Sequence, residues 1–222
     1  MVTAKINDKA VVIPERFTVS EWVELQQLGF DSSQQWPLIL EKVTGVDALQ
    51  FKEADEEAVE LFMSFISVAM NERKAVELPD FNGINFGQFV DLDCYISLGI
   101  EKHLQIMLDV LEVDTPWAPN ALYIIESYIK WRTSIYRKYK DLFGLKDTDF
   151  QPGAEDNVEE FNPMDVSRNW YNVIVELAGE DILKMDRVTE EPLEKVLTFL
   201  QIKKEKALKE AQEARNKRLR KA

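Results

Sequence analysis

Apolar side chains recur at helical spacing through most of this chain, and one stretch of that pattern occurs twice. A shift of 67 positions (84 − 17) places residues 17–47 over residues 84–114 without a gap. The identical pairs are Val23/Val90, Leu25/Leu92, Ile39/Ile106, Val43/Val110, Val46/Val113 and Asp47/Asp114. The pattern therefore predicts one packing unit that the sequence encodes two times.

Both stretches open with the signals of a helix start. Thr18 can cap the first helix, and Glu21, three residues later, completes a capping box. Asn85 and Gln88 occupy the same two positions in the second stretch. A chance alignment would have little reason to preserve this pair, so the caps favour a duplication.

The fold class that follows is mainly α. Each copy is predicted to contain a short extended segment, ended by proline, and then three helices. Two β-like runs at residues 4–6 and 10–13, on either side of Asn7 and Asp8, predict a small hairpin before the first copy. The second copy should end at Gly144, which can stop its long third helix.

A C-terminal helical unit is predicted after the second copy. Asp165 is expected to cap its first helix and Thr189 its last, with Pro192 in the first turn of that last helix. The last helix should run from 190 to about residue 220, roughly 45 Å at the α-helical rise. Its apolar face thins beyond Ile202, so the distal half is expected to project.

Turn formers and acids predict an exposed linker between the second copy and these C-terminal helices. The expected organisation is an N-terminal hairpin with the first repeat at 1–75, the second repeat at 76–145, an acidic linker at 146–163, and C-terminal helices with a basic terminal helix at 164–222.

The charge is unevenly distributed along the chain. The net charge is −13, yet residues 201–222 contain nine Lys or Arg and three Glu, or +6, which leaves −13 − 6 = −19 for residues 1–200. An acidic body repels nucleic acid and anionic membranes, whereas the terminal helix can contact either.

Cysteine usage and hydropathy narrow the class of protein further. The single cysteine, Cys94, excludes an intramolecular disulfide and favours a reducing compartment. The first residues lack the apolar run of a signal peptide, and no later run approaches the ~18 residues of a membrane span. We therefore expect a protein that is not a membrane protein.

Little in the sequence points to chemistry. His103 is the only histidine and is interpreted as a packing residue, and Cys94 has no evident base beside it. No glycine-rich phosphate loop occurs. We therefore predict no catalytic, cofactor-binding or metal-binding residues and no enzyme; an enzyme built on Cys94 or His103 is the weakest hypothesis.

Two other groups of residues receive structural interpretations. Asp91, Asp93 and Glu101 are interpreted as solvated charges rather than as a cation site. The aromatic residues between Trp117 and Tyr139 alternate with Lys and Arg, which is typical of a packed face with a basic edge and less so of a single-strand stacking surface.

The chain resembles proteins encoded in the structural modules of tailed bacteriophages. The residues that carry this resemblance are the duplicated stretches from Thr18 and Asn85 and the segment at 170–184, within an acidic, helical, tryptophan-bearing chain. The resemblance is to tail or baseplate assembly proteins and chaperones. It implies a noncatalytic protein that binds other phage proteins, during assembly or as a virion structural component.

The functional hypothesis is thus a phage protein–protein interaction protein without a cofactor, located in the host cytoplasm during assembly, with retention in the virion left open. Its partners would be other phage structural proteins, and a homo-oligomer is also open. The alternative is a nucleic-acid-associated or regulatory module that uses the basic helix. The predicted partner-binding residues are Leu208, Ala211, Arg215, Lys217, Arg218, Leu219, Arg220 and Lys221.

Overall fold

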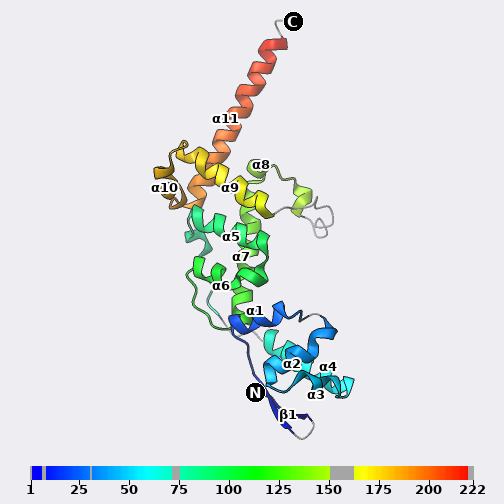
Figure 1. Cartoon of the computed structure of the whole chain (residues 1–222). Helices are drawn as coiled ribbons and strands as arrows, with labels where there is room; N and C mark the ends of the chain where they lie inside the picture. The colour runs from blue at the N-terminus through cyan, green and yellow to red at the C-terminus, as the bar shows by residue number, and fades with distance from the viewer. Residues whose placement is uncertain (1, 7–8, 31, 72–75, 151–162, 220–222) are drawn as a thin grey trace. The chain divides into compact units, whose positions relative to one another are not determined.

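The computed structural model describes residues 2–6, 9–30, 32–71, 76–150 and 163–219, and this part of the chain is mainly helical, as predicted (Figure 1). The chain divides into two compact units, each built from two separate stretches of sequence. The first unit comprises Met1–Pro79 and Gly99–Glu126, and the second comprises Asp80–Leu98 and Ser127–Ala222.

The first unit contains a hairpin and a set of helices. These elements are β1 (Val2–Ile6), β2 (Lys9–Ile13), α1 (Val19–Gln27), α2 (Trp36–Thr44), α3 (Ala48–Lys52), α4 (Glu56–Asn71), α6 (Ile100–Val110) and the first part of α7 (Ala118–Lys138). Most of its fully buried side chains are aliphatic, among them Leu25, Ile39, Leu40, Ile66, Leu104 and Met107.

The second unit is built from helices and has a more aromatic core. Its elements are α5 (Phe86–Leu98), the second part of α7, α8 (Lys140–Phe143), α9 (Pro163–Ala178), α10 (Met185–Thr189) and α11 (Leu193–Leu219). Short 3₁₀ turns occur at Ser33–Gln35 in the first unit and at Phe81–Gly83, Asp147–Phe150 and Ile182–Lys184 in the second.

The predicted hairpin is confirmed. β1 and β2 pair antiparallel, with Val2 opposite Ile13 and Ile6 opposite Lys9. The predicted turn residues, Asn7 and Asp8, lie outside the described residues. Ile13 is 1% exposed and β2 packs against α2, so β2 contributes to the core of the first unit.

Both predicted capping boxes are confirmed. The backbone N–H of Thr18 donates to Oε2 of Glu21 at 2.8 Å, and the N–H of Glu21 donates to Oγ1 of Thr18 at 3.2 Å. The N–H of Asn85 donates to Oε1 of Gln88 at 2.9 Å, and the N–H of Gln88 donates to Oδ1 of Asn85 at 2.8 Å. Each box satisfies two donors that a helix start leaves unpaired.

The two capped helices are also anchored in the same manner, each within its own unit. The N–H of Val19 donates to the carbonyl of Pro116, just before α7, at 2.9 Å. The N–H of Phe86 donates to the carbonyl of Glu191, just before α11, at 2.9 Å. α1 packs against α6, and α5 packs against α9. The starts of the two aligned stretches therefore share a local structure.

The rest of the predicted duplication stays a prediction. Residues 48–52 form α3, an additional helix for which the second stretch has no predicted equivalent. α5 belongs to the same compact unit as the C-terminal helices, whereas α6, which follows it in sequence, belongs to the other unit. The predicted repeat boundaries at 75, 145 and 163 likewise remain sequence-based expectations.

Three predicted helix boundaries are wrong. α9 begins at Pro163, so Asp165 lies in its first turn, where an acid favours the helix dipole, rather than at its cap. Thr189 ends α10, and its hydroxyl donates to the carbonyl of Asp186 at 2.8 Å. α11 starts at Leu193, after Pro192.

The third wrong boundary concerns the long helix of the second copy, which breaks before Gly144. Tyr139 has φ −110° and ψ 30°, and it separates α7 from the short helix α8. Gly144 then adopts φ 71°, the left-handed conformation expected of a helix stop. The predicted linker contains the turn at Asp147–Phe150, and its residues 151–162 lie outside the described part of the chain.

We expect Gly87→Ala to lower the free energy of unfolding. A Cβ atom at Gly87 would lie 2.9 Å from Cβ of Thr189 and 3.2 Å from its carbonyl oxygen, so α5 and the end of α10 would have to separate. The expected cost is about 1–3 kcal/mol, as for other overpacked sites. Urea unfolding measures it.

The matched control is Gly83→Ala, whose added Cβ would lie 3.6 Å from Oδ2 and 4.0 Å from Cγ of Asp80, both ordinary van der Waals distances. Its free energy of unfolding should stay within about 0.5 kcal/mol of the wild-type value. Equal stability of the two variants would contradict a close contact between α5 and α10.

Candidate functional site

A buried carboxylate lies at the centre of the second unit. Asp93, on α5, is 2% exposed, and a charge removed from water is costly unless it is paired and hydrogen-bonded. Nε of Arg132 donates to its Oδ1 at 2.5 Å. Its Oδ2 accepts from the hydroxyl of Tyr136 at 2.9 Å and from Nε1 of Trp170 at 2.7 Å. We call these four residues the Asp93 network.

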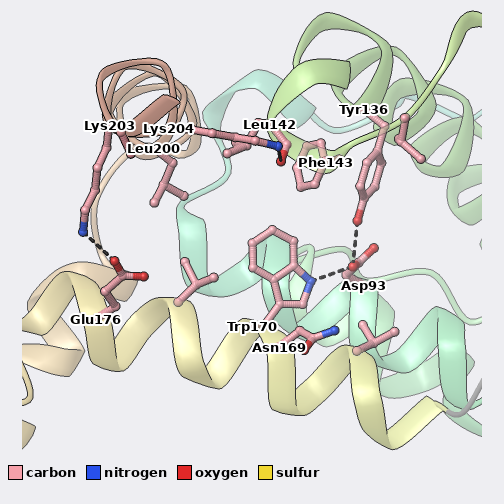
Figure 2. Close-up of a pocket in the computed structure, with 14 residues that line it drawn as sticks. Asp93, Tyr136, Leu142, Phe143, Asn169, Trp170, Glu176, Leu200, Lys203 and Lys204 are labelled. Atoms are coloured by element: carbon pink, nitrogen blue, oxygen red, sulfur yellow. Dashed lines mark hydrogen bonds and ion pairs between the residues drawn. The ribbon is translucent and has the colours of Figure 1, made fainter. Parts of the chain in front are cut away.

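The network joins three helices of the second unit. Arg132 and Tyr136 lie one turn apart on α7, so both side chains reach the same point on α5. Trp170 comes from α9 (Figure 2). The guanidinium of Arg132 also forms an ion pair with Asp93 and lies 4.6 Å from the centroid of the Tyr136 ring. The network therefore fixes the mutual register of α5, α7 and α9.

Aromatic rings surround the network. Trp170 contacts Phe86 and Phe89 edge to face, with ring centroids 5.7 and 5.8 Å apart, and the rings of Tyr136 and Phe143 are 4.4 Å apart. Such pairs stabilise a core beyond the effect of area burial. In the second unit, the aromatic residues of α7 thus form the predicted packed face rather than a stacking surface.

The tyrosines of this core have strongly shifted ionisation. Burial raises the pKa of Tyr128 and of Tyr136 well above the ordinary phenol range, and the negative charge of Asp93 raises both pKa values further. The hydroxyl of Tyr128 is buried with no hydrogen-bond partner among the described residues, whereas that of Tyr136 donates to Asp93.

A pocket of about 650 Å³ opens beside the network. Asp93, Tyr136 and Trp170 lie at one side of it, and α8, α9 and α11 supply the other walls (Figure 2). Its size is within the range of small-molecule sites, and most of its lining side chains are apolar.

Two lysines of α11 stand at the pocket. Nζ of Lys203 lies 2.7 Å from Oε1 of Glu176. Nζ of Lys204 donates to the backbone carbonyl oxygens of Asp141, at 2.5 Å, and Leu142, at 3.0 Å, at the end of α8. A carbonyl satisfies a donor without cancelling its charge, so the bonds of Lys204 leave a positive charge at this rim.

The predicted partner-binding residues lie further along α11. Leu208, Ala211, Arg215 and Lys217 are exposed, and Leu208 is 61% exposed. Arg218 and Leu219 are part of α11, but their side chains lie outside the described part of the structure, as do Arg220 and Lys221 entirely. None of these four exposed residues lines the pocket. The residues of α11 that line it are Leu200, Lys203, Lys204 and Ala207.

The interpretation of Asp93 as a solvated charge is wrong, whereas Asp91 and Glu101 are exposed as expected. The partners of Asp93 lie 39, 43 and 77 residues away along the chain, so no local spacing reveals them. Among the described residues, no three His, Cys, Asp or Glu side chains gather in a way that could hold a metal ion.

Cys94 and His103 occupy positions that suit packing. Burial raises the pKa of the Cys94 thiol, which keeps it protonated and a weak nucleophile near neutral pH. Nδ1 of His103 lies 2.9 Å from the carbonyl oxygen of Gly99, one turn earlier in the chain.

Comparisons with known proteins give no further guide to function. Neither family models nor curated proteins nor solved structures yielded a match to this chain. Within the described residues, no helix combines the length and the apolar character required to cross a membrane.

We expect Asp93→Asn to reduce the free energy of unfolding by about 2–4 kcal/mol, because the Arg132 charge would lose its buried counter-ion. Arg132→Met should cost a similar amount, and the double variant should cost less than the sum. Urea unfolding of all three gives the coupling energy. Asp91→Asn, on the exposed face of α5, is the control; additive costs would contradict a coupled network.

The shifted tyrosines predict a loss of stability at alkaline pH. Above about pH 10 an unfolded tyrosine ionises while a folded one with a raised pKa stays protonated, so the free energy of unfolding falls as pH rises. Tyr128→Phe should reduce this fall without a cost at neutral pH, since its hydroxyl has no partner among the described residues.

Tyr136→Phe is the comparison variant, because it also removes a hydrogen bond to Asp93. It should lose about 1–3 kcal/mol at neutral pH. Urea unfolding at pH 7, 10 and 11 separates the two effects. An unchanged alkaline slope in Tyr128→Phe would contradict a raised pKa for this residue.

Proposed function

We propose that this chain is a noncatalytic phage protein that binds other structural proteins during tail or baseplate assembly, as a chaperone or as a component of the virion. In this proposal the second half of α11 projects as a binding arm, and the two aligned stretches belong to tandem three-helix copies that form its support. The site of action is the host cytoplasm during assembly.

One observation carries the proposal. α11 begins with the buried residues Leu193, Val196 and Leu197, whereas every residue at 202–217 is exposed. In proteins, most of the stability of a helix comes from an apolar face packed against a neighbour. A second protein that packs against Leu208 and Ala211 would supply that neighbour.

The charge of the arm indicates the chemistry of its partner. Residues 201–222 have a net charge of +6 and residues 1–200 one of −19. Two such arms repel each other, so pairing between two α11 helices is disfavoured. The partner surface is therefore expected to combine acidic side chains with an apolar strip, a description that fits an acidic phage protein or the acidic body of another copy.

The alternative, a nucleic-acid-associated or regulatory module, uses the same basic residues. It requires binding that weakens steeply with salt because phosphate contacts release counterions. Fluorescence anisotropy with DNA and RNA at several salt concentrations tests it. Salt-dependent binding that disappears in a chain ending at residue 202 would favour this alternative over the protein partner.

We expect Leu208→Asp to abolish capture of a phage structural protein while leaving stability within about 0.5 kcal/mol of the wild type, because the changed side chain is exposed. Gln212→Asp, also exposed on α11, adds the same charge and should retain capture. The measurement is affinity capture of the tagged chain from phage-infected cells, with the captured protein identified by mass spectrometry.

The same capture experiment can refute the proposal in two ways. A wild-type chain that elutes as a monomer and recovers no phage structural protein would remove its basis. Equal recovery by Leu208→Asp and Gln212→Asp would show that the exposed half of α11 is not the binding surface.

A further inference from the structure

The pocket beside the Asp93 network takes no part in the proposed binding of a protein partner. Its walls include Leu142 and Phe143 near the end of α8, Val173 on α9 and Leu200 on α11. Each of these four side chains is only half-buried, so the pocket exposes apolar surface to water. An apolar occupant would recover the free energy that this exposure costs, about 25 cal/mol per Å².

Asp93, on the inner side of the pocket, already has its hydrogen-bond partners. Both carboxylate oxygens of Asp93 accept hydrogen bonds within the network. The charge of Asp93 is also balanced by Arg132. A ligand atom that reaches Asp93 therefore gains nothing from being polar. The inner end of the pocket favours a hydrocarbon or an aromatic ring.

The rim of the pocket has a different character. The Glu176 carboxylate is held by Lys203, so this pair is neutral overall. Lys204 contacts only carbonyl oxygens in its two bonds and uses two of the three hydrogens of its ammonium group. The rim thus has a net positive charge, and the ammonium group of Lys204, a residue that lines the pocket, has one hydrogen left to donate.

We propose that this pocket binds a single-chain amphiphile with a negatively charged head group, such as a medium-chain fatty acid. The tail lies against Phe143, Val173 and Leu200, and the head group accepts a hydrogen bond from Lys204. A charge-assisted bond of this kind, at the edge of an apolar pocket, selects an anionic head over a cationic one. The site does not depend on a protein partner for α11.

The first experiment measures whether binding occurs in this pocket. Equilibrium dialysis of the full chain with radiolabelled dodecanoate, below its micelle concentration, should give saturable binding of one molecule per chain. Ala207→Trp places an indole at the pocket wall and should weaken binding by at least about tenfold, since it fills space that the tail needs.

Ala211→Trp is the matched control, because Ala211 is exposed on the same helix and does not line the pocket. Both alanines are exposed, so both variants should retain the helical circular dichroism spectrum. Absence of saturable binding, or equal affinity of the two variants for dodecanoate, would overturn the proposal.

The second experiment measures head-group selection. Lys204→Met keeps the apolar stem and removes the charge, and it should weaken dodecanoate binding about five- to tenfold. Lys206→Met, at an exposed position outside the pocket, should leave the affinity unchanged. Dodecyltrimethylammonium, with the same tail and the opposite charge, should bind more weakly than dodecanoate to the wild type. Equal binding of both amphiphiles would overturn the role of Lys204.

A final arm separates two sources of the same ligand chemistry. Sedimentation of the chain with phosphatidylcholine vesicles that contain lysophosphatidylglycerol, lost in Ala207→Trp and Lys204→Met, would identify the single-chain anionic amphiphile as a membrane lipid. Dodecanoate binding without such sedimentation would identify it as a free acid. Sedimentation that neither variant changes would come from the basic part of α11 and would exclude a membrane lipid as the ligand of the pocket.

Discussion

Burial of the Asp93 carboxylate is the constraint on which the second unit depends. An ionised side chain that is 2% exposed is tolerated only because three donors converge on it. Those donors come from two helices, so the position of the two carboxylate oxygens of Asp93 determines how α7 and α9 lie against α5. The same orientation of Trp170 that directs its Nε1 to Asp93 also places its ring edge to face with Phe86 and Phe89.

The pocket is a direct consequence of this arrangement. Trp170 and Tyr136 are held towards Asp93, and the space between them and α11 is left open (Figure 2). α11 has two roles along its length. Its first turns complete the core through Leu193 and Leu197. The exposed turns that follow concentrate positive charge, and the first of them also form a pocket wall.

Local features of this fold could be predicted from the sequence, and long-range ones could not. The capping box of Thr18 and that of Asn85 depend on residues three positions apart, so the pattern contains them completely. The burial of Asp93 depends on Trp170, 77 residues away, and an acid within an apolar helix gives no sign of such a partner. The grouping of α5 with α9 is invisible for the same reason: helical periodicity reports that a face is buried but not which helix covers it.

The interleaved order of the two units has a consequence for synthesis of the chain. α5 leaves the ribosome well before α9, the helix that covers it, because 80 residues separate their ends at Leu98 and Ala178 (178 − 98). At typical translation rates this interval lasts roughly 4–16 s. During that time Phe86 and Phe89 have no native cover from α9, so the nascent chain presents an aromatic surface that cellular holdases recognise.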